Sequence, residues 1–136
     1  MKVVIGLILG TLSFNSIGCE SELPKTSHVE YYRTTAAKLY QDFETDEENT
    51  ISKIGGNPII IKGEVIVVDK DLALDVVVRL NTDTLFGSIK ATMLDTDKHQ
   101  AIYLSRGDNI TLECESIFSR INGNPILSNC KFHKEN

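Results

Sequence analysis

The chain has 136 residues, a length that allows one domain built around one hydrophobic core. Hydrophobic residues make up 41% and charged residues 24%, which excludes a chain that is disordered over most of its length, and three cysteines are too few for a disulfide scaffold. The formal net charge is −5, and because an acidic surface repels phosphate, we expect no nucleic acid as partner.

The first 18 residues have the pattern of an export signal. Lys2 supplies a positive charge, residues 3–14 carry no charge, and small residues precede Cys19. A membrane span needs ~20 apolar residues, more than this run provides. A buried core helix is the alternative, but the two glycines inside the run disfavour it.

This segment resembles a bacterial lipoprotein signal, although Ser16 stands where leucine is usual. The resemblance implies that residues 1–18 are a signal peptide and that Cys19 carries a diacylglyceryl group on its thiol and an acyl chain, such as palmitate, on its amine. The protein would then be anchored to a membrane of the bacterial cell envelope, facing the periplasm or the surface. Glu20 replaces the aspartate associated with inner-membrane retention, which favours the outer membrane, and residues 19–27 form the lipidated cysteine and a polar tether.

A helical segment is expected next. Ser27 and Glu30 have the spacing of a capping box, and apolar residues then recur at three and four positions, namely Tyr32, Ala36, Leu39 or Tyr40, and Phe43. A second box, Thr45 with Glu48, restarts a shorter helix that ends at Gly55-Gly56. The acidic cluster at 46–48 could bind a cation, but three acids in a first turn are expected to complement the helix dipole.

Strands are predicted from residue 58 onwards, because the apolar period changes to two. Three strands cover residues 58–68, 72–80 and 84–94, and Gly63 permits a bulge or bend in the first. The side chains expected to face inward are Ile59, Ile61, Val65 and Val67 in the first strand, Leu72, Leu74, Val76, Val78 and Leu80 in the second, and Leu85, Ile89, Ala91 and Met93 in the third.

A short helix is expected to follow at residues 95–107, capped by Asp95 or Thr96, with Ala101, Ile102 and Leu104 facing inward. Two further strands, at 109–116 and 125–132, form a hairpin around Asn122-Gly123. Three strands, a helix and two strands are the order of the OB-fold, a five-stranded Greek-key β-barrel. We therefore predict an all-β barrel with added helices: an N-terminal helical segment and a helix between strands three and four. The domain would cover residues 28–136 and the barrel residues 57–136.

Residues 33–133 resemble the tRNA_anti-like family of small bacterial OB-fold proteins. The likeness includes the acidic element in "FETDEENTISKIGGNPIIIKGEV", the glycine of "LSRGDNITLEC", and the family's paired cysteines, one at the end of that segment and one in "GNPILSNC". Four positions depart from the family pattern, namely Asp46 for asparagine, Thr50 for alanine, Ile54 for tyrosine and Asn57 for lysine. The resemblance implies a fold and a location, and no reaction.

Cys114 and Cys130 fall on the two strands of the last hairpin. A two-residue turn at Asn122-Gly123 sets Cys114 opposite Lys131, so one bulge residue would bring Cys130 across. In an exported protein the pair would form a disulfide that closes a loop of about 16 residues and contributes roughly 3 kcal/mol. The alternative is that both thiols pack inward as small hydrophobes.

The outward positions of strands two and three are the usual ligand surface of an OB barrel, and here they hold Asp75, Arg79, Phe86 and Lys90. Barrels that bind nucleic acid place stacking aromatics and a basic groove there. Only Phe86 is aromatic on these strands, and residues 57–136 carry nine basic and eleven acidic side chains. These four residues are our candidate binding face, for a protein or an oligosaccharide.

Neither a metal site, a cofactor nor an active site is expected. Cys130 and His133 are three apart on a strand and face opposite sides. The chain also lacks the common nucleophile, phosphate-loop and zinc motifs. The sequence thus predicts a non-catalytic binding module anchored in the envelope. The alternative is a structural or regulatory protein that docks a partner through its N-terminal helix, and a nucleic-acid-binding barrel is a more distant one.

Overall fold

The structure is a computed structural model and describes residues 29–70, 74–121 and 123–134. The predicted signal peptide, Cys19 and the tether lie outside these residues, as do Ser27 and Leu72. The elements in chain order are β1 (Tyr32–Thr35), α1 (Ala36–Ile54), β2 (Ile59–Lys70), β3 (Val76–Asn81), β4 (Ser88–Met93), α2 (Asp95–Ala101), β5 (Asn109–Ile121) and β6 (Asn124–Phe132).

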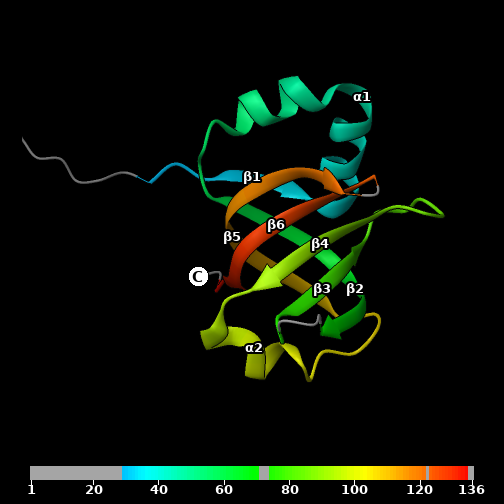
Figure 1. Cartoon of the computed structure of the whole chain (residues 1–136), viewed down its shortest axis with the longest axis vertical. Coiled ribbons are helices and arrows are strands. Elements are labelled where there is room, and N and C mark those ends of the chain that lie inside the picture. The colour runs from blue at the N-terminus through cyan, green and yellow to red at the C-terminus, as the bar shows by residue number, and fades with distance from the viewer. Residues whose placement is uncertain (1–28, 71–73, 122, 135–136) are drawn as a thin grey trace, which may run out of the picture.

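Five of the strands close into a barrel. The strand order is β2-β3-β4-β6-β5, and β2 pairs again with β5. Only the β4–β6 pair among them is parallel. Helix α1 lies across one end of the barrel and α2 at the other (Figure 1). This is the predicted all-β barrel with two added helices, and its strands lie within the predicted range of 57–136.

One side-chain cluster fills the barrel and the space under the helices. Leu39, Phe43 and Ile54 of α1 are buried with the inward residues of the five strands, and Ala101 of α2 closes the other end. Gly63 of β2 lies where α1 approaches most closely, since a Cβ there would meet Ala36 and Leu80 at 3.2 Å. The missing side chain of Gly63 therefore serves helix packing. The pairing of β2 with β5 is regular at Gly63, so the bulge, one of the two expectations for this position, is not found there.

The bulge in β2 lies at Ile66 instead, between the pairs Val65↔Leu80 and Val67↔Arg79. One extra residue reverses the alternation of the strand, so Val67 is exposed and Val68 packs on the core. This corrects the inward assignment of Val67.

The N-terminal helix begins later than predicted. Residues 32–35 form β1, which runs parallel to β2 along the edge that β3 leaves free before Val65. Tyrosine and threonine favour strands, and the side chain of Thr35 accepts a hydrogen bond from Lys38 N (3.2 Å), which caps α1. The capping box at Ser27 and Glu30 therefore does not start this helix.

Helix α1 breaks at Asp46, whose φ of −162° and ψ of 92° are not helical. Asn49 N donates to Asp46 Oδ1 (3.0 Å), so Asp46 caps the second half, one residue after the predicted Thr45. The helix ends at Gly55, which has a φ of 60°. The predicted restart and the predicted end at Gly55-Gly56 are both confirmed.

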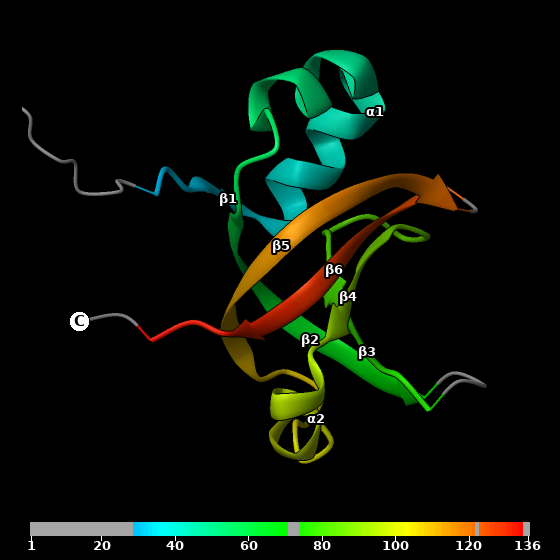
Figure 2. The ribbon, with the colours of Figure 1, turned by 60° about the vertical axis from the view of Figure 1, so that its left-hand side comes forward.

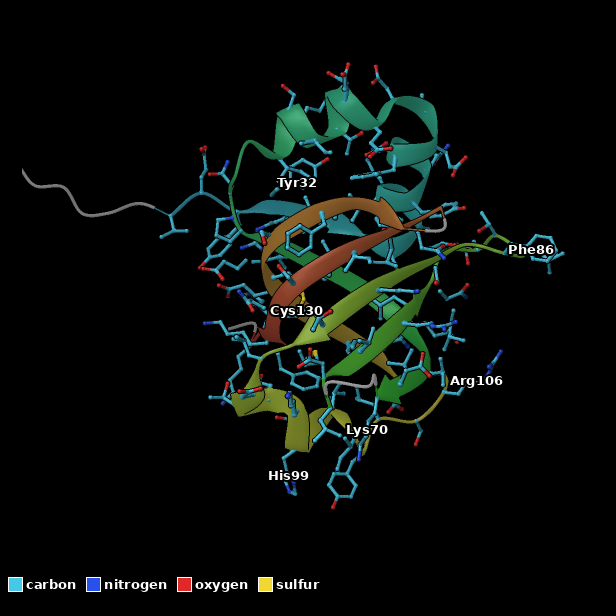
Figure 3. All side chains as sticks on the ribbon, in the orientation of Figure 1. Tyr32, Lys70, Phe86, His99, Arg106 and Cys130 are labelled. Atoms are coloured by element: carbon cyan, nitrogen blue, oxygen red, sulfur yellow. A yellow bond between two sulfur atoms is a disulfide. The ribbon has the colours of Figure 1, made fainter. Side chains whose placement is uncertain are left out.

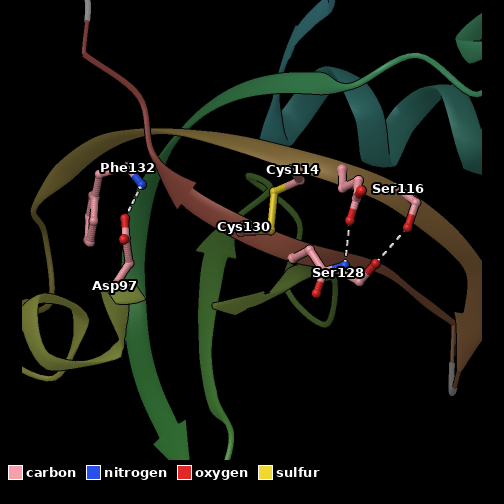
Figure 4. Close-up of a disulfide and its surroundings, with 8 residues drawn as sticks. Asp97, Cys114, Ser116, Ser128, Cys130 and Phe132 are labelled. Atoms are coloured by element: carbon pink, nitrogen blue, oxygen red, sulfur yellow. Dashed lines mark hydrogen bonds between the residues drawn. A yellow bond between two sulfur atoms is a disulfide. The ribbon is translucent and has the colours of Figure 1, made fainter. Parts of the chain in front are cut away.

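Two inward assignments near strand ends are wrong. Leu74 is exposed, with a φ of 68°, because β3 begins only at Val76, and Leu85 is exposed because β4 begins only at Ser88. Neither Asp95 nor Thr96 caps α2. The helix ends at Ala101, and Ile102, the next residue, is exposed. Asp97 Oδ2 instead accepts a hydrogen bond from Phe132 N (2.8 Å) and ties α2 to β6 (Figure 4).

The predicted disulfide is confirmed, since Cys114 and Cys130 are bonded across β5 and β6 and both are fully buried. They are a direct cross-strand pair, and the bulge that brings them into register lies between Phe118 and Ile121. Figure 4 shows the sulfur bridge between the two strands, with the Ser116 and Ser128 hydroxyls bonded (2.6 Å) beside it.

Candidate binding surface

The outward face of β3 and β4 brings two of the four predicted residues together. Arg79 and Lys90 are direct cross-strand partners, so two cations lie side by side on the barrel wall. Arg79 Nε lies 2.9 Å from Asp69 Oδ2 on β2, and this ion pair is partly exposed. One cation is thus partly compensated, which leaves Lys90 as the stronger positive group of the pair.

Apolar residues extend this pair on both sides. The strand register continues from Arg79 to Val67 on β2, and from Lys90 through Ile126 on β6 to Phe118 on β5. We call Val67, Arg79, Lys90, Ile126 and Phe118 the outer row. Phe118 is 56% exposed, Val67 is also exposed, and Ile126 is half-buried. The row therefore joins two central cations to apolar side chains at both ends.

Phe118 and Ile126 were missed by sequence reasoning. Phe118 lay beyond the predicted fourth strand, which ended at residue 116, whereas β5 continues to Ile121. The predicted hairpin turn at Asn122-Gly123 was the available signal, because a two-residue turn requires β5 to reach it.

Asp75 does not belong to the outer row. It precedes β3 and lies 3.4 Å from Lys98 Nζ on α2, and the same amine lies 2.8 Å from Asp95 Oδ1. The hydrogen bond to Asp95 raises the pKa of Lys98 above its ordinary value, and partial burial opposes this effect. Asp75 thus helps to hold α2 against the start of β3.

Phe86 does not lie on a strand. It stands in the loop between β3 and β4, 89% exposed, and points away from the barrel (Figure 3). The predicted strand began at residue 84, but β4 begins at Ser88. The four predicted residues are therefore divided among the outer row, the α2 contact and this loop.

No metal site is found in the described part of the chain, where no three histidine, cysteine, aspartate or glutamate residues gather as ligands. Cys130 is held in the disulfide, and His133 Nδ1 lies 3.4 Å from Glu113 Oε1. Among the described helices, none is long and apolar enough to cross a membrane.

A closed five-stranded barrel with this strand order, and a helix between its third and fourth strands, defines an OB-fold domain, which is a binding fold. The chain belongs to the tRNA_anti-like family, whose model matches residues 1–131. This confirms the resemblance seen in the sequence.

A comparison with curated proteins finds no match. Among solved structures, the chain is similar to one in the crystal structure of the Stn1–Ten1 complex from S. pombe, with 15% sequence identity and a TM-score of 0.44. The match covers 57% of this chain and 59% of that one.

Proposed function

We propose that this protein is a lipid-anchored envelope protein whose barrel is a non-catalytic binding module for a protein or an oligosaccharide. The outer row is the observation that supports the binding role. Two adjacent cations between apolar side chains, on the face that OB barrels use for ligands, suit a ligand with both acidic and apolar groups.

The anchor rests on the sequence pattern around Cys19. Cys19→Ala removes the acceptor thiol, so the variant should lose the mass of the acyl groups and move from the membrane to the soluble fraction. Mass spectrometry and fractionation of cells that express the full chain measure both. A variant that stays with the membrane and keeps an acyl-sized mass increment would refute the anchor.

The binding role is tested by crosslinking the anchored protein in intact cells and identifying what is captured. Arg79→Ala with Lys90→Ala should abolish capture of the specific partner, whereas Lys53→Ala with Lys134→Ala, which removes the same charge from exposed sites outside the row, should leave it intact. An oligogalacturonide, titrated in solution, tests for an acidic glycan.

The alternative docking site is the acidic turn of α1. If the outer-row variant keeps every crosslinked partner while Glu47→Ala with Glu48→Ala loses them, the barrel face is not the binding surface and α1 is.

A further inference from the structure

The loop between β3 and β4 exposes the two most accessible large apolar side chains of the described residues. Leu85 is 87% exposed and its neighbour Phe86 is 89% exposed. We call residues 82–87 the apolar loop. Exposed apolar groups of this size contribute nothing to the core, and contiguous ones mark interaction sites.

The backbone of the apolar loop is held from within. Buried Thr82 donates its hydroxyl to Gly87 O (2.8 Å), and Gly87 N donates to Thr84 Oγ1 (3.1 Å). The hydroxyls of Thr82 and Thr84 also bond each other (2.8 Å), and Asp83 N donates to Asn81 Oδ1 (3.0 Å). Four hydrogen bonds therefore fix the base of the loop.

Helix α1 supports the same base. Gly87 is buried under Tyr40, close enough that any side chain at Gly87 would overlap the tyrosine ring. A loop that is ordered before binding loses little entropy when it docks, so its two apolar side chains act as a preorganised anchor.

A polar hollow of about 270 Å³ adjoins the anchor. Its lining includes Leu85, Thr84, Asn81, Glu64 and Arg106, so it offers a carboxylate and a guanidinium. Figure 3 shows Phe86 and Arg106 on the same side of the molecule. An apolar anchor beside a polar hollow matches the common arrangement of a protein interface, in which buried anchors are surrounded by polar contacts.

A lipid surface fits this loop less well. Residues 82–87 contain Asp83 and no lysine or arginine, whereas segments that insert into anionic membranes carry cations beside their apolar groups. The loop also lies on the side of the barrel away from the start of β1 (Figures 1 and 2).

A second copy of the chain fits less well too. An apolar groove formed by Val29, Tyr31, Pro58 and Leu94 is rimmed by Glu113 and Glu115, and Lys131 lies 4.0 Å from Glu113, so the rim keeps a net negative charge. These acids would face Asp83 of an inserted loop, and like charges disfavour that contact.

We infer that the apolar loop docks onto a protein partner, one with an apolar pocket for Leu85 and Phe86 and a polar side chain for the hollow at Glu64 and Arg106. The inference rests on the proposed binding function and selects protein as the partner class over oligosaccharide.

The test places the photocrosslinker p-benzoylphenylalanine at position 86 in the full chain in its native cells. The matched control places it at position 103. Tyr103 is 72% exposed and lies against His99 of α2, at the end of the barrel opposite α1 (Figure 1). We expect a discrete protein adduct from position 86 and none of that mass from position 103. The captured protein is identified, purified and titrated with the wild type, Phe86→Ser, Leu85→Ser and Tyr103→Ser.

Loss of a central anchor should weaken binding about tenfold or more for Phe86→Ser and Leu85→Ser, with unfolding midpoints unchanged and Tyr103→Ser close to the wild type. Lipid adducts alone, an adduct of twice the chain mass, or equal affinity of Phe86→Ser and the wild type would each overturn the inference. If Phe86→Ser binds normally and the outer-row variant does not, the inference fails while the proposed function stands.

Discussion

Among the described glycines, Gly87 has the least room for a side chain. It is buried between Tyr40 of α1 and the hydroxyl of Thr84, and an added Cβ would overlap both. Its φ is not positive, so the constraint is steric and comes from the neighbours rather than from the backbone.

Gly87→Ala should therefore destabilise the protein by about 1–3 kcal/mol, the cost of overpacking a filled site. Chemical denaturation of the single variants Gly87→Ala and Tyr40→Leu and of the double variant measures it. The smaller leucine makes room for the methyl group, so the double variant should lose less than the two single losses combined. Strict additivity would show that Tyr40 is not what excludes the side chain.

At the scale of elements, one side-chain hydroxyl bridges the break in α1. Thr50 is buried, and its Oγ1 donates toward the carbonyls of Asp42 (3.0 Å), in the turn before the break, and of Asp46 (2.8 Å), the break residue itself. The Thr50 hydroxyl therefore links the turn before the break to the residue at which the helix restarts.

Thr50→Val keeps the shape and removes the hydroxyl, which should lower the free energy of unfolding by about 1–3 kcal/mol, because two part-buried carbonyls lose this donor. Thr45→Val is the matched control, since Thr45 also donates to a helix carbonyl (2.9 Å to Gln41 O) but is exposed. Its loss should be about 0.5 kcal/mol or less. Equal losses in urea titrations of the two variants would contradict this role of Thr50.

The last hairpin supplies a second prediction. Replacing Cys114 and Cys130 together by alanine opens a loop that spans a sequence separation of 16, which should cost about 3 kcal/mol. Guanidinium unfolding with and without reductant measures this loss. The wild type should fall toward the variant when reduced, and the variant should not respond. A wild type insensitive to complete reduction would show that the bridge adds no stability.

Features that neighbouring residues determine could be predicted from the sequence, whereas one bulge in β2 could not. Alternation predicted Val76, Val78 and Leu80 inward, and the hairpin turn with one bulge predicted the disulfide, because both signals are local. The bulge at Ile66 was not predictable, since nothing local distinguishes that residue, and it reversed the assignment of Val67.

Long-range pairing explains the other misses. Tyr32 has helical spacing to Ala36, yet residues 32–35 form β1 because β2 offers a free edge 27 positions further on, where Tyr32 pairs with Ile59. Phe86 was placed on a strand because its neighbours are apolar, and the hydrogen bonds that form the loop involve side chains whose roles a sequence does not state. Half of the candidate face, Arg79 and Lys90, was nevertheless placed correctly on the barrel wall.

At the scale of the whole molecule, charge decides between ligands that the fold could accept. OB barrels that bind single strands combine stacking aromatics with a basic groove. Here the outer row holds two cations, one paired with Asp69, and one exposed aromatic, Phe118. The chain as a whole carries a net charge of −5. The barrel therefore offers cationic and apolar groups side by side, but too little positive charge to attract a phosphate backbone.

We accordingly expect no saturable binding of a fluorescent 20-nucleotide single-stranded DNA at physiological salt, measured by anisotropy on residues 19–136. Weak binding at low salt should disappear steeply as salt is added, because few counterion-releasing contacts can form. Arg79→Ala with Lys90→Ala should not change the result at physiological salt. Micromolar affinity there, lost in that double variant and kept in Lys53→Ala with Lys134→Ala, would instead make the outer row a nucleic-acid surface and overturn the choice of partner.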